Sequence, residues 1–189
     1  MRTHIKKRIS ASIFITIGLI AYLIVGNPIG PFLFSFGLLS VCILNGDLFT
    51  GKCGYMWRND WKILILILII NLFSGYFFGF LCRWLNPALI ELAIVKISSW
   101  EVSFSYFLKS VFCGMIMYIA VDIYKSGHII GILFGIPLFI FCGFQHCIAN
   151  IILMGIALSY NFIPLIICII GNFIGSIFIN LLLNSNKSS

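Results

Sequence analysis

The segment that decides the fold is Gly143-Phe144-Gln145-His146-Cys147-Ile148-Ala149-Asn150, which interrupts a long apolar stretch. That stretch runs from Ile129 to Ser159, 31 residues, whereas a helix needs about 20 residues to cross the hydrocarbon core of a bilayer. Hydrocarbon offers no hydrogen-bond partner to Gln145, His146 or Asn150. We therefore expect a helix that is broken near Gly143, with the break buried in protein or lining a cavity.

The composition around this segment indicates an integral membrane protein. The chain has 189 residues, of which 61% are hydrophobic and 9% charged, and a soluble domain could not hide that much apolar surface. Few residues remain outside the apolar stretches, so we expect one all-α transmembrane domain over residues 1–189 and no soluble enzyme. A cleaved signal peptide is disfavoured, because a second apolar stretch follows the first at once. The six expected spans are 9–26, 31–45, 63–82, 104–121, 129–159 and 162–183.

The positive charge is distributed unevenly between the loops. The net charge of +7 comes from twelve basic and five acidic residues, and nine of the twelve lie in alternate loops or at the ends of the chain. This is the asymmetry of the positive-inside rule, so we expect both termini in the cytoplasm and no nucleic-acid partner. The nine residues are Arg2, Lys6, Lys7, Arg8, Lys52, Arg58, Lys62, Lys125 and Lys187.

Two features of the sequence occur twice. Asn71 begins NLFSGYFFG and Asn172 begins NFIGSIFIN, 101 residues later. The segment ILNGDLFTG interrupts the stretch after Pro31 much as GFQHCIAN interrupts the later one, and Gly46 and Gly143 are 97 residues apart. Three spans per repeat would place the halves in opposite orientations, so we expect an inverted 3+3 repeat with a substrate site near the midplane.

The repeat predicts which polar residues meet. Asp47 and Thr50 of the first break are expected beside His146 and Asn150 of the second. An ionisable group inside a membrane is a functional hypothesis by default. The seven cysteines are odd in number and form no CxxC pair, so we interpret them as small buried side chains.

Both interruptions resemble the signatures of the formate/nitrite transporter family. The resemblance is carried by GDLFTG after FSFGLLSVCILN, and by FIFCGFQHCIAN with the later GNFIGS. It implies an aquaporin-like fold, a homopentamer with one pore per protomer, and passage of a small monovalent anion such as formate, nitrite, lactate or hydrosulfide. The resemblance also implies the inner (cell) membrane of a bacterium as the expected location.

The resemblance also implies roles for single residues. His146 resembles the central pore histidine, Thr50 the threonine that approaches it, and Asn150 the asparagine one turn beyond. Lys96, expected in the loop before span four, lies near the family's pore-mouth lysine, whereas Lys109 is expected to extend toward the lipid headgroups. The constriction residues are Leu48 and Phe139 with Phe49 on the cytoplasmic side, and Phe34 and Leu38 on the opposite side.

Two residues depart from the family pattern, and both leave the substrate in doubt. Gln145 stands where many members have glutamate, and Gly114 where many have a pore asparagine. The chain is also shorter than most members. A transport-impaired member of the family therefore stays an alternative.

His146 suits proton exchange, because the ordinary pKa of histidine is about 6.5. We expect an anion to gain a proton at or near His146 and to pass as the neutral acid. The sequence leaves open whether the histidine donates this proton or only orders nearby water molecules and shapes the local electric field.

Two further classes of function are weighed against an anion channel. An intramembrane enzyme or a metal site would need several converging ligands or catalytic groups, but Asp47 is the one acidic residue at a suitable depth, so no cofactor or metal is expected. An aquaporin-like channel for neutral solutes would need two facing Asn-Pro-Ala segments, and the chain has one, Asn86–Ala88.

Overall fold

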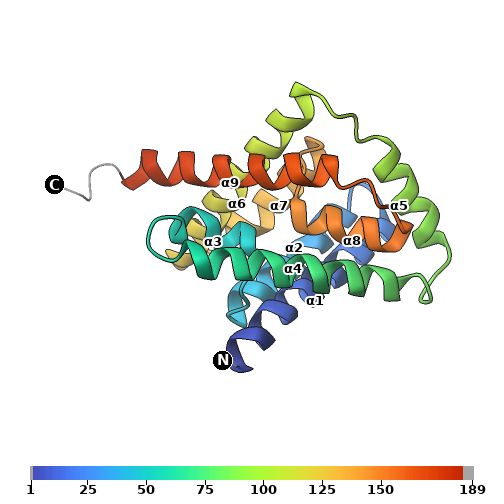
Figure 1. The fold of residues 1–189 in the computed structure, drawn as a ribbon, viewed down its shortest axis with the longest axis horizontal. Helices are drawn as coiled ribbons and strands as arrows, with labels where there is room; N and C mark the ends of the chain where they lie inside the picture. The colour runs from blue at the N-terminus through green and yellow to red at the C-terminus, as the bar shows by residue number, and fades with distance from the viewer. Residues whose placement is uncertain (1, 185–189) are drawn as a thin grey trace.

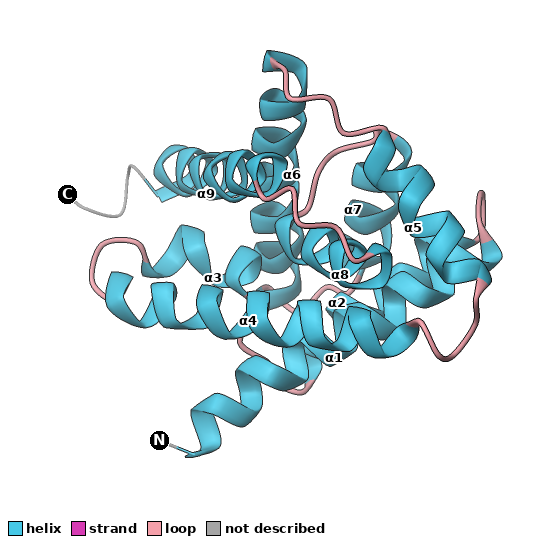
Figure 2. Ribbon diagram, turned by 45° about the vertical axis from the view of Figure 1, so that its right-hand side comes forward, coloured by secondary structure: helices cyan, strands magenta, loops and turns pink. Residues whose placement is uncertain are grey.

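The computed structural model describes residues 2–184 of the chain. Figure 2 shows that the described chain consists of helices joined by loops, without a strand. The helices are α1 (Arg2–Val25), α2 (Gly30–Ile43), α3 (Phe49–Met56), α4 (Trp61–Cys82), α5 (Ala88–Ser98), α6 (Phe104–Lys125), α7 (Ile130–Phe141), α8 (Cys147–Ala157) and α9 (Ile163–Asn184).

Four helices are long and apolar enough to cross a membrane: α1 from Thr3 onward, α4, α6 and α9. A helix of 22 residues, such as α4, extends about 33 Å at 1.5 Å per residue, close to the thickness of a hydrocarbon core. Figure 1 shows α4 and α9 lying lengthwise and running in opposite directions. Large side chains such as Phe73 on α4 and Phe178 on α9 are exposed, as expected for surfaces that face lipid.

The remaining apolar stretches are each divided into two shorter helices, and the expected breaks are confirmed. In the first, α2 ends at Ile43 and α3 begins at Phe49. In the second, α7 ends at Phe141 and α8 begins at Cys147. Each break contains a left-handed residue, Asn45 with φ 54° and Gly143 with φ 67°, which are residue types that adopt this conformation at little cost.

The two halves of the chain pack in the same pattern. In the first half, α1 packs on α2 and α4, and in the second half α6 packs on α7 and α9. The half-helices cross over: α3 packs on α9 and α8 on α4. The ends of the two breaks are thereby brought together in the centre of the molecule.

Glycines let these helices approach one another within the protomer. A Cβ at Gly114 on α6 would collide with the backbone of Asn172 on α9, and a Cβ at Gly79 on α4 would collide with that of Ile152 on α8. Gly114 is therefore a position of close packing between α6 and α9. The three GxxxG pairs also pack internally: Gly75 and Gly79 against α8, and Gly131, Gly135, Gly171 and Gly175 against α6.

The structure differs from expectation in the segment before α6, where α5 replaces a loop. Its buried residues Leu89 and Ala93 are four apart and pack on the body of the protein. The Asn-Pro-Ala segment begins this helix, with Asn86 Oδ1 accepting a hydrogen bond from the N–H of Ala88 at 3.0 Å. Lys96 therefore lies on a helix and not in a loop.

Candidate functional site

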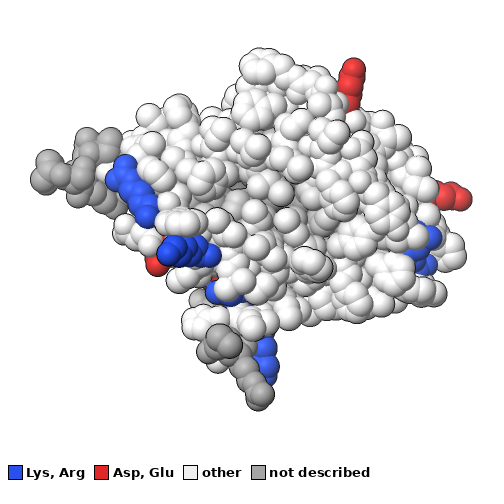
Figure 3. Space-filling view, in the orientation of Figure 1, with Lys and Arg blue, Asp and Glu red and all other residues white. Residues whose placement is uncertain are grey.

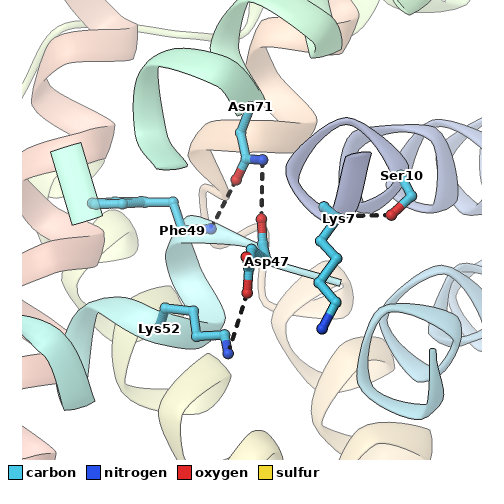
Figure 4. A network of polar contacts seen from close by, with 6 residues as sticks. All are labelled: Lys7, Ser10, Asp47, Phe49, Lys52 and Asn71. Atoms are coloured by element: carbon cyan, nitrogen blue, oxygen red, sulfur yellow. Dashed lines mark hydrogen bonds and ion pairs between the residues drawn. The ribbon is translucent and has the colours of Figure 1, made fainter. Parts of the chain in front are cut away.

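A buried asparagine anchors the first break. The Asn71 side chain on α4 accepts a hydrogen bond from the N–H of Phe49, the first residue of α3, at 2.8 Å. Its Nδ2 donates to the carbonyl of Asp47 in the break at 3.1 Å and to that of Arg8 on α1 at 2.9 Å. Figure 4 shows Asn71 reaching from α4 to Phe49 and Asp47.

Asn172 on α9 anchors the second break with the same set of bonds. It accepts from the N–H of Cys147, the first residue of α8, at 2.9 Å. Its Nδ2 donates to the carbonyl of Gln145 in the break and to that of Ser110 on α6, both at 2.8 Å. Both asparagines are fully buried, so each break is held by an amide whose donors and acceptor are all used.

The predicted meeting of His146 and Thr50 is found where the two breaks approach each other. His146 Nε2 lies 2.9 Å from Thr50 Oγ1, and both side chains are buried. His146 is the N-cap of α8, and its Nδ1 accepts a hydrogen bond from the N–H of Ala149 at 3.0 Å.

This arrangement fixes the tautomer of His146. A ring nitrogen that accepts a hydrogen bond carries no proton, so the imidazole is neutral and its proton lies on Nε2. Nε2–H then donates to Thr50 Oγ1. The Thr50 hydroxyl keeps its own hydrogen, which can be donated to another acceptor.

Asn150 lies one turn along α8, and its amide is already engaged. Its Nδ2 donates to Tyr106 Oη and to Gln145 Oε1, both at 3.1 Å. Gln145 Nε2 in turn donates to the carbonyl of Gly143 at 3.1 Å. A carboxylate at position 145 could not make that last bond because it has no hydrogen to donate.

Aromatic rings connect His146 to Lys96. Lys96 Nζ lies 2.6 Å from Tyr22 Oη and 4.9 Å from the centre of the Tyr22 ring. From there the ring centroids step from Tyr22 to Phe34 (6.4 Å), from Phe34 to Phe139 (6.0 Å) and from Phe139 to His146 (6.0 Å). Lys96 is thus held at one end of a path whose other end is the central histidine.

These residues line one cavity of about 350 Å³, which we call the Lys96 cavity. Lys109 also lines it, so this cavity has a second basic lining residue beside Lys96. Tyr106 also lines the cavity, and its hydroxyl accepts a hydrogen bond from Asn150. This residue was not predicted from the sequence. Its lining residues include Tyr22, Phe34, Lys96, Tyr106, Lys109, Phe139, His146 and Asn150.

A second, smaller cavity of about 140 Å³ lies on the other side of the breaks. Lys52 and Lys125 line it together with Leu38 and Leu48, and we call it the Lys52 cavity. The expected grouping of the constriction residues is therefore corrected. Leu38 and Leu48 line the Lys52 cavity, whereas Phe34 and Phe139 line the Lys96 cavity.

Comparisons with known proteins agree with this arrangement. The sequence pattern described as "Formate/nitrite transporter" matches residues 1–185. The chain belongs to the formate/nitrite transporter family. A search of curated proteins finds no match.

Two solved structures of the family share the fold. One, "FNT family ion channel", has a TM-score of 0.77 at 18% identity, covering 96% of this chain and 86% of the other. The second, "Pentameric formate channel with formate bound", has a TM-score of 0.76 at 20% identity, covering 97% of this chain and 94% of the other. This formate/nitrite transporter is thus an integral membrane protein with the helical fold of these channels.

Two predicted site residues of this transporter lie elsewhere than expected. The Asp47 carboxylate pairs with Lys52 at 3.4 Å, and the backbone N–H of Asp47 donates to the carbonyl of Lys7 at 3.0 Å. Asp47 therefore faces away from the His146–Thr50 contact. Phe49 is buried but lines neither cavity. Within residues 2–184, no group of three or more His, Cys, Asp or Glu is placed to hold a metal ion.

Proposed function

We propose that this chain is a channel for small monovalent anions of the formate, nitrite or hydrosulfide class, with proton-linked passage at His146. The observation that carries the proposal is the His146–Thr50 hydrogen bond at the meeting of two broken helices. Irregular backbone at membrane depth is tolerated where it is buried in protein or lines a cavity, and here it borders a cavity that two lysines line.

The path proceeds in three steps. Lys96 and Lys109 attract an anion into the Lys96 cavity, where their charge offsets part of the cost of removing its water. Phe34 and Phe139 then narrow the way to His146 and Thr50. Leu38 and Leu48 form the second narrowing, before the Lys52 cavity.

The two apolar narrowings favour a neutral species. An ion loses several kcal/mol of hydration in a low-dielectric passage, whereas the protonated weak acid does not. Neutral His146 cannot supply the proton, because giving up its Nε2 hydrogen would leave an anion. We infer that the acid takes its proton from water in the cavity, and that His146 holds Thr50 so that the hydroxyl hydrogen is donated to the substrate.

The assembly and orientation belong to the same proposal. We propose six spans in an inverted 3+3 repeat, with α2–α3 and α7–α8 each forming one broken crossing. The matched bonds of Asn71 and Asn172 support the repeat. The distribution of basic residues supports cytoplasmic termini, and the Lys52 cavity would then open on that side. A homopentamer in a bacterial inner membrane is part of the same proposal, and the likeness to a pentameric formate channel supports the assembly.

Uptake into proteoliposomes tests the function. Labelled formate, nitrite, hydrosulfide and lactate are offered to liposomes with and without the protein, beside glycerol-driven swelling. We expect saturable uptake of at least one of the anions, faster when the outside is more acidic, and no swelling in glycerol. Glycerol swelling without anion uptake would indicate the neutral-solute channel, and no flux of any kind would indicate a transport-impaired member.

A further inference from the structure

The Lys52 cavity carries positive charge that has no role in the three-step anion path. Among its lining residues are two ammonium groups, Lys52 from α3 and Lys125 from the end of α6, and no carboxylate. The two charges are close enough to repel each other. Two cations that face one cavity from different helices raise the local concentration of anions.

The surroundings hold each cation in place without neutralising both. Lys52 pairs with Asp47 at 3.4 Å, and this is the one ion pair in the described part of the chain. Lys125 Nζ lies 3.1 Å from the centre of the Tyr55 ring. Tyr55 in turn donates a hydrogen bond to Asp122 Oδ1 at 2.9 Å and stacks on Tyr118. Lys125 is therefore positioned against an aromatic face, and it lines the cavity from the end of α6.

The Asp47 backbone is anchored independently of its charge. Its N–H bonds to Lys7, its carbonyl to Asn71, and the N–H of neighbouring Gly46 to Val41. Figure 4 shows the carboxylate directed toward Lys52, away from Asn71. Removing that charge should therefore leave the break in place while freeing Lys52. Asp47 is in this sense a tethered carboxylate that competes with a free anion for the Lys52 ammonium.

We propose that the Lys52 cavity is a binding site for a small monovalent carboxylate or similar anion, formed by Lys52 and Lys125 and weakened by Asp47. The cavity has room for a few water molecules at ~30 Å³ each, and hence for an anion of the size of formate. It lies against Leu48 and Leu38, so an anion held there waits at the second narrowing. This inference rests on the proposed function for its biological meaning, but not for its test.

Cys42 provides a probe inside this cavity, because its half-buried thiol is one of the lining residues. The purified protein in detergent, with the exposed Cys142 changed to serine, is alkylated by iodoacetate or by iodoacetamide. The two reagents have nearly the same shape, and only the first is a carboxylate. The ratio of their rates cancels the reactivity of the thiol itself and reports the electrostatic potential at Cys42.

We expect the iodoacetate-to-iodoacetamide rate ratio at Cys42 to exceed that of a free peptide thiol. Lys125→Gln and Lys52→Gln should each lower the ratio about threefold to tenfold, a range expected for one charge at this separation in a partly aqueous site. Asp47→Asn should raise it by a similar factor. Lys125→Arg should preserve it, and Lys62→Gln, which removes a lysine outside the cavity, should leave it unchanged. Formate should slow alkylation by either reagent.

The proposal is overturned by a ratio that equals that of the free thiol, by equal effects of Lys62→Gln and Lys125→Gln, or by no protection from formate. It is overturned as well if neither reagent reaches Cys42 in the folded protein, because the cavity would then be closed to carboxylates. None of these outcomes depends on flux. A channel that transports none of the tested anions but shows the charge preference would refute the proposed function and leave this site standing.

Discussion

At the scale of single residues, the contact between His146 and Thr50 was predictable, but the role of His146 at the helix end was not. The pairing followed from two breaks at equivalent places in the sequence. The N-cap bond to Ala149 depends on the exact start of α8, which the sequence did not define. It is this bond that makes the imidazole neutral, so the choice between proton donor and organising group required the structure.

The constriction residues show a similar limit. Phe34 and Leu38 were expected on one face of a helix, and both are buried. Four residues along a helix correspond to about 6 Å. This distance is enough for Phe34 to line the Lys96 cavity on one side of the breaks and for Leu38 to line the Lys52 cavity on the other. Their partners, Phe139 and Leu48, come from other elements, and only the packing of α2 on α7 decides which residues face each other.

The first prediction concerns Phe139, whose ring lies between Phe34 and His146. Phe139→Ala should widen the first narrowing, because a void of side-chain size is left in a packed site. We expect faster flux and admission of larger anions such as lactate. Leu138→Ala is the matched control, since Leu138 is exposed on the outer face of the same helix. If both variants show wild-type rates and selectivity in proteoliposomes, Phe139 does not form the narrowing.

At the scale of elements, the four long apolar helices and both breaks were predicted from span length and polar interruptions. Helix α5 was missed because the polar residues around Asn86 and Glu91 were interpreted as a loop. The signals were present: a side-chain acceptor at Asn86, a proline directly before the first helical residue, and apolar residues four apart at Leu89 and Ala93. The close packing of α6 on α9 at Gly114 could not be predicted, because it depends on the distance between two helix backbones.

The second prediction concerns the two asparagines that anchor the breaks. Asn71→Ala and Asn172→Ala each remove the acceptor of a buried N–H at the start of a half-helix, together with a donor to two carbonyls. At about 1–3 kcal/mol for an unsatisfied buried group, we expect each variant to lose about 1–3 kcal/mol of stability. Thermal unfolding in detergent should show a lowered midpoint for both. Asn180→Ala is the control, because its partly exposed amide bonds to a single tyrosine hydroxyl; an equal loss there would argue against a special role of the anchors.

At the scale of the whole molecule, the charge distribution agrees with the expectation from the loops. Figure 3 shows basic side chains gathered at the end that holds the N-terminus and α3, and a smaller basic patch at the opposite end. The sequence could indicate this asymmetry because it depends on loop order alone. It could not indicate that lysines from separate helices, such as Lys52 and Lys125, share one cavity.

The third prediction is that the protein assembles as a ring of five with one pore per protomer. The GxxxG pairs do not contribute to this expectation, because they pack inside the protomer. What supports it is the family and the large apolar surface that remains exposed on α4, α7 and α9. Native mass spectrometry in mild detergent should give a pentamer mass, whereas stable monomers over a range of detergents would count heavily against it.

The measurement that tests the central claim most directly is the pH dependence of labelled formate uptake by wild type and His146→Asn. Asparagine is a favourable N-cap residue, so this variant should keep α8 in place while withdrawing the Nε2–H bond from Thr50. If His146 organises Thr50 and the proton comes from water, uptake by the variant should fall tenfold or more at every pH. The slope of uptake against pH should then stay that of wild type. Loss of the pH dependence in an assembled variant would contradict the account, because His146 would then be the group that supplies the proton. An unchanged uptake rate would also contradict it, because His146 would then act only as the N-cap of α8.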